Sequence, residues 1–319
     1  MKLWIIGLQG VGKTTIFQLL THRKLATNPA HKVMCGANID VPDTRLDFLS
    51  ETLKSKKTTY AKIELIDLPG FTKTNLTSLQ IADALIGVIP LFGKFNEPKK
   101  QWQELISELI LRDKEICENT LKKIKTLQEK ELLEKCNYKL SEGILLREIG
   151  INDVELKLLR GYGFLTLKPS VVILNTEDLN KEIDLDTNIL KFNAKLEIEI
   201  SELTEEDRKE YQKEFGITGS PIDRFVKFAF PALKVISFFT VVGDEARAWQ
   251  IMEGMPIIKA AGKVHSDMEQ GFIRADIIGF EDFKSAGSFK SAKEAGKIHT
   301  VKQDYIVKDG DIIEFKFKV

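Results

Sequence analysis

The sequence is poor in cysteine and has no excess of either charge. Its 319 residues include three cysteines, Cys35, Cys117 and Cys136, which lie too far apart in the chain for a metal-binding motif. We therefore expect reduced thiols, buried or idle, in a cytoplasmic protein. Lys plus Arg and Asp plus Glu both total 47. The overall charge thus gives no indication of binding to nucleic acid or to a membrane surface.

Long hydrophobic runs are also absent. No apolar stretch reaches the roughly 20 residues of a membrane helix, so we expect no contact with a membrane. The N-terminal stretch "MKLWIIG" is apolar over only a few residues before glycines begin, which predicts a strand and not a signal peptide. The length of the chain allows two or three domains.

The strongest local signal follows that first strand. The segment "GLQGVGKT" satisfies the pattern G-x-x-x-x-G-K-[ST], with an apolar strand before it and a helical stretch after it. In this pattern backbone N–H groups surround phosphate oxygens, Lys13 reaches the β- and γ-phosphates, and the Thr14 hydroxyl binds Mg²⁺. The predicted phosphate-binding residues are Gly7, Leu8, Gln9, Gly10, Val11, Gly12, Lys13, Thr14 and Thr15.

A second signal lies at the end of the apolar strand "KIELID". Asp67 and Gly70 form an Asp-x-x-Gly motif, in which the aspartate binds the magnesium and the glycine N–H contacts the γ-phosphate. We therefore name Lys13, Asp67 and Gly70 as candidate catalytic residues, and Thr14 and Asp67 as candidate metal ligands. GTP switch proteins usually carry a glutamine next, which orients the attacking water. Here that residue is Phe71, whose ring cannot orient a water.

Two weaker signals indicate a site for the base. The strand "PSVVILN" ends in Asn175-Thr176-Glu177-Asp178, which is similar to the N-K-x-D motif of GTPases except that Thr176 replaces the lysine. Further along, Asn193-Ala194-Lys195 is similar to the S-A-K loop that also lines the base. The predicted base-binding residues are Asn175, Thr176, Asp178, Asn193, Ala194 and Lys195. These residues leave the choice between ATP and GTP open.

The pattern of the chain changes twice along its length. From Pro98 a long charged stretch carries apolar residues at helical spacing, and a second helical stretch, 142–159, follows a break at Asn137-Tyr138. Together they predict a helical hairpin, which could be a structural spacer or a partner-binding arm. After residue 232 short apolar strands alternate with turns, and the last two, "DYIV" and "IIEFKFKV", are joined by a hairpin-turn signal at 308–311.

These changes predict an α/β P-loop NTPase domain with a mainly parallel sheet, an inserted α-helical hairpin and a C-terminal α+β domain. The predicted boundaries are 1–96 and 161–232 for the NTPase domain, 97–160 for the hairpin, and 233–319 for the C-terminal domain. The single P-loop and the helical insert lead us to expect a monomer.

The C-terminal stretch "EARAWQIMEGMPIIKAAGKVHSDMEQGFIRADIIGFEDF" closely resembles the TGS domain of the YchF family of Obg-like ATPases. The stretches "VPDTRLDFLSE", "ELILRD", "GFLTLKPSVVILN" and "ISELTEEDRKEY" are similar to other parts of that family, in the same order. The resemblance covers nearly the whole chain. It implies an Obg-type NTPase domain, a β-grasp TGS domain, a preference for ATP over GTP, and a ribosome-associated role in translation or stress regulation. It also implies a hydrophobic residue in place of the glutamine, as at Phe71.

The chain departs from this family around the expected site of hydrolysis. The histidine proposed for catalysis in the family lies in a loop shortly after Asp-x-x-Gly, whereas this chain has no histidine between His31 and His265. Gly10 replaces a potassium-coordinating asparagine, and Asp178 replaces a glutamate. Three functions therefore remain open. The chain could be an Mg²⁺-dependent NTPase with a preference for ATP, a nucleotide-binding scaffold with negligible hydrolysis, or a GTP-preferring GTPase.

Overall fold

Two six-stranded β-sheets organise the described part of the chain, and each belongs mainly to one of two units. The computed structural model describes residues 1–23, 34–68, 70, 78–124, 126–185 and 187–318. The first unit contains residues 2–37 and 64–221, and the second contains residues 1, 38–63 and 222–319. Strands β2 (Cys35–Val41) and β4 (Ala61–Asp67) contribute residues to both units.

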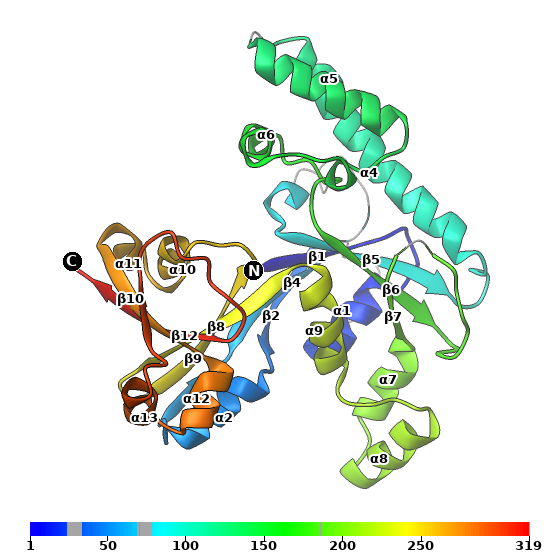
Figure 1. Cartoon of the computed structure of the whole chain (residues 1–319). Helices are drawn as coiled ribbons and strands as arrows, with labels where there is room; N and C mark the ends of the chain where they lie inside the picture. Colours follow the sequence, from blue (N-terminus) through cyan, green and yellow to red (C-terminus); the bar gives the residue numbers. More distant parts are fainter. Residues whose placement is uncertain (24–33, 69, 71–77, 125, 186, 319) are drawn as a thin grey trace. The chain divides into compact units, whose positions relative to one another are not determined.

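The sheet of the first unit has the strand order β2-β4-β1-β5-β6-β7 and is parallel from β4 to β7 (Figure 1). Strand β5 (Ala84–Leu91) is buried at every position, as expected for a central strand of a parallel sheet that is covered on both faces. The other elements around it are β1 (Lys2–Ile6), β6 (Ser170–Thr176), β7 (Ile189–Phe192), α1 (Lys13–Thr21), α7 (Ala194–Ser201) and α8 (Glu205–Glu214). The predicted, mainly parallel α/β sheet is confirmed.

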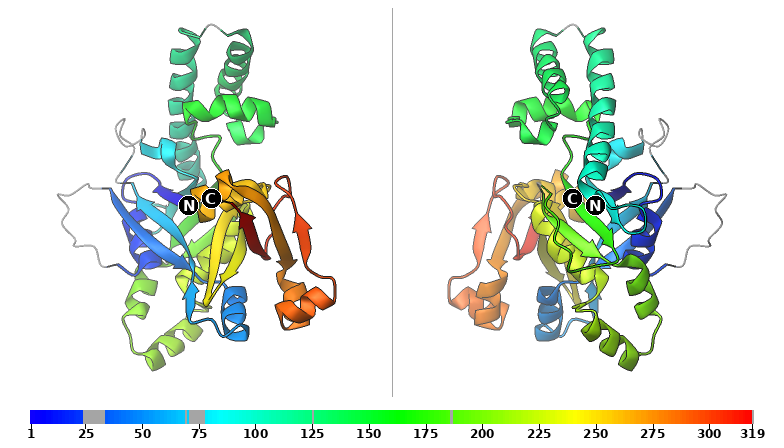
Figure 2. Two further views of the ribbon diagram at one scale, coloured as in Figure 1. Left: turned by 90° about the vertical axis from the view of Figure 1, so that its left-hand side faces the viewer. Right: turned by 90° about the vertical axis from the view of Figure 1, so that its right-hand side faces the viewer.

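The helical insert lies between β5 and β6 and is built on α4 (Pro98–Leu121) and α5 (Leu127–Ser141), which lie side by side (Figure 2). The predicted helix break at residues 137–138 is wrong. Helix α5 continues through it because buried residues at helical spacing, Leu132, Leu133, Cys136 and Leu140, pack in one cluster with Cys117 of α4.

The stretch 142–159, predicted to be one helix, is mostly not α-helical. Gly143 has a left-handed φ of 80°, which ends the preceding helix. Only α6 (Asp153–Leu159) forms an α-helix in this stretch, where the Asn152 and Glu155 side chains make a capping box.

Asp113 anchors α4 to the segment that leads into β6. Its side chain is fully buried and accepts hydrogen bonds from the N–H groups of Leu165 (3.0 Å) and Thr166 (2.6 Å), and from the Thr166 hydroxyl (2.7 Å). The neighbouring Arg112 donates to Asp113 (2.6 Å) and to the Gly163 carbonyl (2.9 Å). Burial raises the pKa of Asp113, while these bonds and the Arg112 charge lower it. The anchor therefore depends on every one of these partners.

The sheet of the second unit has the order β11-β10-β12-β8-β9-β3. Its strands are β3 (Lys57–Thr59), β8 (Val235–Val242), β9 (Glu245–Met252), β10 (Phe272–Gly279), β11 (His299–Val301) and β12 (Asp311–Phe317). Helix α10 (Ile257–Val264) packs on one face, and α2 (Thr44–Thr52), α12 (Phe280–Ala286) and α13 (Phe289–Glu294) pack on the other. The remaining α-helices among the described residues are α9 (Pro221–Ala232) and α11 (Ser266–Gln270).

The prediction of a C-terminal hairpin between "DYIV" and the last strand is wrong. Residues 304–307 make only an isolated bridge, Pro256 to Ile306, and β12 pairs with β10 and β8 instead. The Asp311 carboxylate accepts from the Lys308 N–H (2.9 Å) and the Tyr305 hydroxyl (3.0 Å). These side-chain bonds hold the turn and replace the strand pairing that the sequence suggests.

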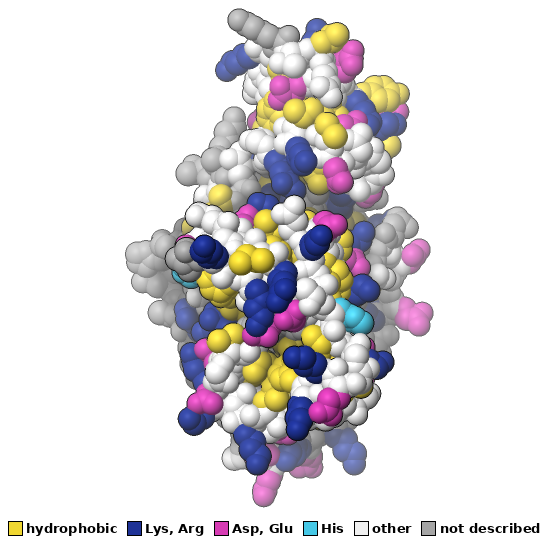
Figure 3. Space-filling view, turned by 60° about the vertical axis from the view of Figure 1, so that its left-hand side comes forward, with side chains coloured by type: hydrophobic (Ala, Val, Ile, Leu, Met, Phe, Trp, Pro, Cys, Tyr) yellow, Lys and Arg dark blue, Asp and Glu magenta, His cyan; other side chains and the backbone are white. Residues whose placement is uncertain are grey.

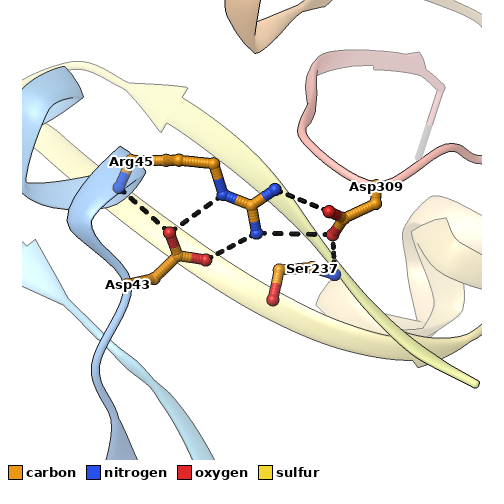
Figure 4. Close-up of polar contacts among 4 residues, drawn as sticks. All are labelled: Asp43, Arg45, Ser237 and Asp309. Carbon is orange, nitrogen blue, oxygen red and sulfur yellow. Dashed lines mark hydrogen bonds and ion pairs between the residues drawn. The ribbon is translucent and has the colours of Figure 1, made fainter. Parts of the chain in front are cut away.

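An ion-pair network connects the N-terminal end of α2 to the C-terminal turn (Figure 4). The Arg45 guanidinium donates to Asp43 (2.8 Å) and to Asp309 (2.7 Å), whose carboxylate also accepts from the Ser237 N–H (2.9 Å). Strand β3 adds to this link because it pairs in parallel with β9. Residues 38–63 therefore group with the C-terminal part of the chain, although the sequence prediction assigned them to the NTPase domain. The predicted domain boundaries otherwise stay a prediction.

No helix among the described residues is long and apolar enough to cross a membrane.

The Asp113 anchor generates a stability prediction. We expect Asp113→Ala to lower the free energy of unfolding of the first unit by about 3 kcal/mol, because it leaves buried N–H groups and the Arg112 charge without a partner. Urea unfolding followed by circular dichroism measures the change. Glu115→Ala removes the same charge from an exposed position of α4 and serves as the control. Equal losses in both variants would contradict the role given to Asp113.

Candidate nucleotide-binding site

The carboxyl ends of the parallel strands bring together segments that are far apart in the sequence. The P-loop follows β1, Asp67 ends β4, Asn175 and Thr176 end β6, and Asn193 follows β7. Strands β4, β1, β5, β6 and β7 are neighbours in this order, so all of these segments lie along one edge of the sheet (Figure 1). Such an edge is where open α/β sheets bind their ligands.

The P-loop has the backbone geometry of a phosphate cradle. Gly10 and Gly12 take left-handed φ angles of 82° and 90°, which glycine adopts without strain. Gly12 caps α1 without a side-chain hydrogen bond, so the first N–H groups of the helix point toward a ligand position. Lys13, which is 7% exposed, donates to the carbonyls of Gly7 (3.0 Å) and Leu8 (2.8 Å). These bonds hold its ammonium group within the loop.

Thr14 and Asp67 form the charged part of the site. The Thr14 hydroxyl donates to Asp67 Oδ2 at 2.6 Å, while Asp67 Oδ1 is buried and has no hydrogen-bond partner among the described residues. Burial raises the pKa of Asp67, opposed by the Thr14 bond and the Lys13 charge. Burial likewise lowers the pKa of Lys13, opposed by the Asp67 charge. A buried carboxylate oxygen without a donor, beside a threonine hydroxyl, suits a hard cation.

Asn175 connects the P-loop to the predicted base site. Its amide Nδ2 donates to the Val11 carbonyl (3.3 Å), and its Oδ1 accepts from the Ala194 N–H (3.4 Å). It also lies against Gly12, where a Cβ atom would overlap the amide nitrogen. Asn175 therefore links the P-loop to the loop after β7, and sequence reasoning could not find its contact with Gly12 because the two lie far apart in the chain.

The two base-site segments are also connected to each other. Asn193 Oδ1 accepts from the Leu196 N–H (3.2 Å) and so caps α7, while its Nδ2 donates to the Glu177 carbonyl (3.3 Å). The Thr176 hydroxyl accepts from the Asp178 N–H (3.1 Å). The Asp178 side chain is exposed and accepts from the Asn180 N–H (2.9 Å). Asp178 therefore keeps a carboxylate at the surface of the site.

The remaining predicted residues take more peripheral positions. Thr15 is half-buried in the first turn of α1, and Gln9 and Lys195 are exposed. Gly70 has a left-handed φ of 137°. Phe71 and His31 lie outside the described residues. The structure thus brings the predicted residues together along one edge, and their roles in binding stay predictions.

Phe95 is a candidate that sequence reasoning missed. It follows β5, which lies next to β1, and a Cβ atom at Gly10 would lie 3.8 Å from its ring. Phe92 packs edge-on against it, with ring centroids 5.8 Å apart. The only sequence signal is a pair of aromatic residues in "LFGKFNEP", directly after a buried strand. A ring beside the P-loop could stack on a base.

Known proteins similar to this chain match it over its full length. The chain is 33% identical to the ribosome-binding ATPase YchF of Buchnera aphidicola subsp. Schizaphis graminum, in an alignment that covers 100% of this chain and 99% of that protein. Identity to the protein of the same name from Escherichia coli O157:H7 is 32%, with the same coverage. Identity to the Bacillus subtilis protein is 30%, in an alignment that covers 99% of this chain and 98% of that protein.

The chain belongs to the YchF family. A family model called YchF-GTPase_C, described as a protein of unknown function (DUF933), matches residues 235–318. The solved structure of the YchF GTPase of Schizosaccharomyces pombe superposes with a TM-score of 0.81 at 25% identity, covering 99% of this chain and 97% of that one. This likeness confirms the predicted P-loop NTPase fold. The alignment with the Buchnera protein spans 359 positions, so this chain of 319 residues is a shortened member of the family.

The contact between Gly12 and Asn175 generates a prediction for binding. We expect Gly12→Ala to weaken nucleotide binding at least about tenfold, because a side chain would be strained at this φ and would displace Asn175 from the P-loop. Titration with fluorescent ATP and GTP measures the loss. Gly161→Ala, at a position where a Cβ meets open space, is the matched control. An unchanged affinity of Gly12→Ala for both nucleotides would rule out this role.

Proposed function

We propose that this protein is an Mg²⁺-dependent nucleoside triphosphatase that cleaves the β–γ phosphoanhydride bond of ATP or GTP and associates with ribosomes. The observation that carries the proposal is the convergence of Lys13, Thr14 and Asp67, with Asp67 Oδ1 buried and lacking a hydrogen-bond donor among the described residues. Relatives that are named ribosome-binding ATPases support the activity and the partner.

The residues fit a magnesium ion. The Thr14 hydroxyl and the Asp67 carboxylate would hold the ion, directly or through water, as the oxygen ligands that Mg²⁺ prefers. When bound, the ion neutralises charge on the phosphate oxygens. Lys13 supplies a second positive charge at the same position, and burial at 7% exposure limits its screening by water. The backbone N–H groups of the P-loop then position the phosphates.

The chain itself offers little to orient the attacking water. Phe71 stands in the position of the usual glutamine, and no histidine occurs between residues 31 and 265. We therefore expect slow turnover that a partner raises, because charge and positioning alone supply part of the rate. The same residues favour a second candidate function, a nucleotide-binding scaffold that signals by occupancy and hydrolyses negligibly.

The choice of base has support on both sides. The name of the bacterial relatives favours ATP. The exposed Asp178 carboxylate favours GTP, since an aspartate at this position of the motif pairs with guanine. Thr176 opposes a preference for GTP, because it replaces the lysine of that motif. A Phe95 ring could stack on either base, because every base has a π-face. We propose ATP as the preferred substrate and Asp178 as the residue that retains some affinity for GTP.

The proposed activity predicts how the rate of ATP hydrolysis responds to magnesium and to the substitution of Asp67. We expect single-turnover hydrolysis of ATP that requires Mg²⁺, increases with added ribosomes, and falls about 100-fold or more in Asp67→Asn. Asp184→Asn changes an exposed aspartate of the same unit and is the control. Tight ATP binding without turnover, with and without ribosomes, would reject the enzyme and favour the scaffold.

The base site predicts a change in preference. If the Asp178 carboxylate reads guanine, Asp178→Ala should weaken GTP binding by about tenfold and leave ATP binding within about twofold, because one charge-assisted hydrogen-bond pair is lost. Competition between the two nucleotides for a fluorescent analogue measures both affinities. Glu177→Ala removes the neighbouring exposed carboxylate and controls for the loss of charge. Equal changes for ATP and GTP would show that Asp178 does not read the base.

A further inference from the structure

On one face of the second sheet, residues of the same chemical kind lie opposite each other on β10 and β12. The strand register places Arg274 opposite Lys316, Asp276 opposite Glu314, and Ile278 opposite Ile312. Side chains at alternate positions share a face, so these pairs form three steps along the same face: basic, acidic and apolar.

The charged steps oppose folding. Like charges directly opposite each other in an antiparallel pair are destabilising, and here two such pairs follow one another. They are only partly compensated within the fold. Lys316 forms an ion pair with Glu314 on its own strand, and the Thr300 hydroxyl donates to Asp276 at 2.6 Å. Arg274 is exposed and makes no hydrogen bond or ion pair with another described residue. Such a costly arrangement suggests a surface retained for binding.

The acidic pair borders an apolar cavity on this face. The cavity has a volume of about 340 Å³, and it is lined by the hydrophobic residues Val241, Ile278, Phe289, Ile298 and Ile312. Ile277 and Ile313 also border it, although their side chains belong to the cluster on the opposite face. Asp276 and Glu314 complete the lining. Figure 3 shows hydrophobic side chains exposed beside acidic and basic ones on one side of the molecule. The cavity can take an apolar side chain, with the two carboxylates beside it.

We propose that this face binds an extended segment of a partner protein that presents an apolar, a basic and an acidic side chain at alternate positions. The apolar side chain fills the cavity, the basic one lies between Asp276 and Glu314, and the acidic one reaches Arg274 and Lys316. Alternate residues of an extended chain lie about 7 Å apart, which equals the step between successive pairs on the sheet. RNA fits less well, because its phosphates would meet the Asp276 and Glu314 carboxylates next to the basic pair.

The test uses the full chain with labelled isoleucine methyl groups and two synthetic peptides. The first, acetyl-Ser-Leu-Ser-Arg-Ser-Glu-Ser-amide, has the proposed order, and the second exchanges its Arg and Glu. We expect the first peptide to shift the methyl resonances of Ile278, Ile298 and Ile312, and to bind about fivefold more tightly than the second. Equal binding of both peptides, or shifts confined to other methyl groups, would overturn the proposal.

Two variants separate binding from folding. Asp276→Asn combined with Glu314→Gln should weaken the first peptide about fivefold and raise the urea midpoint of unfolding, because the like-charge repulsion is removed. A merely structural role of these carboxylates would instead lower the midpoint. Asp304→Asn combined with Glu253→Gln removes two exposed carboxylates of the same unit and is the control.

A uridine-rich RNA oligonucleotide distinguishes the other class of partner. Under the proposal the RNA leaves the resonances of Ile278, Ile298 and Ile312 unshifted and does not displace the peptide. RNA binding that is lost in Arg274→Gln, with no binding of either peptide, would replace the protein partner with nucleic acid.

Discussion

The burial of Lys13 and Asp67 at one edge of a parallel sheet is the constraint on which the first unit depends. Both side chains are less than one-tenth exposed, and burial disfavours the charged form of each. Their charges offset each other, and Thr14 and the carbonyls of Gly7 and Leu8 satisfy part of their hydrogen-bonding capacity. The arrangement persists because β1, β4 and the fully buried β5 hold it in register. A nucleotide with a divalent cation would supply the charges that the protein leaves unpaired.

Asn175 extends this constraint from the P-loop to the predicted base segment. The side-chain amide of Asn175 contacts both the P-loop carbonyl of Val11 and the N–H of Ala194. A displacement of the P-loop or of the loop after β7 is therefore transmitted to the other loop. Gly12 makes the contact possible because it has no side chain in the space that the amide occupies. Asn193 then links the loop after β7 to the loop after β6 through Glu177. The predicted phosphate and base segments thus form one connected structure.

Most of this site could be predicted from the sequence, because a P-loop is a local pattern whose strand, loop and helix are consecutive. Asp67 and Asn175 followed from their positions at the ends of apolar strands. Phe95 and the Gly12 contact could not be predicted, since they depend on which strands are neighbours. The same limit explains the larger errors. Strand β3 pairs with β9 almost 190 residues later, and Asp311 bonds to Lys308 and Tyr305 in place of the expected hairpin. Helix α5 crossed a predicted break because burial against α4 outweighs local preference.

The places where the chain keeps an unfavourable arrangement are also its best candidate sites. Asp113 is buried more deeply than Asp67, yet its carboxylate accepts three hydrogen bonds and an arginine contact, which identifies it as structural. Asp67 has one oxygen that lacks a donor among the described residues. Asp276 on β10 lies directly opposite Glu314 on β12, so two negative charges face each other. Folding alone favours satisfied groups, so incomplete compensation points to a ligand. This criterion agrees with the cation that we propose at Asp67 and with the basic side chain that we propose at the acidic pair.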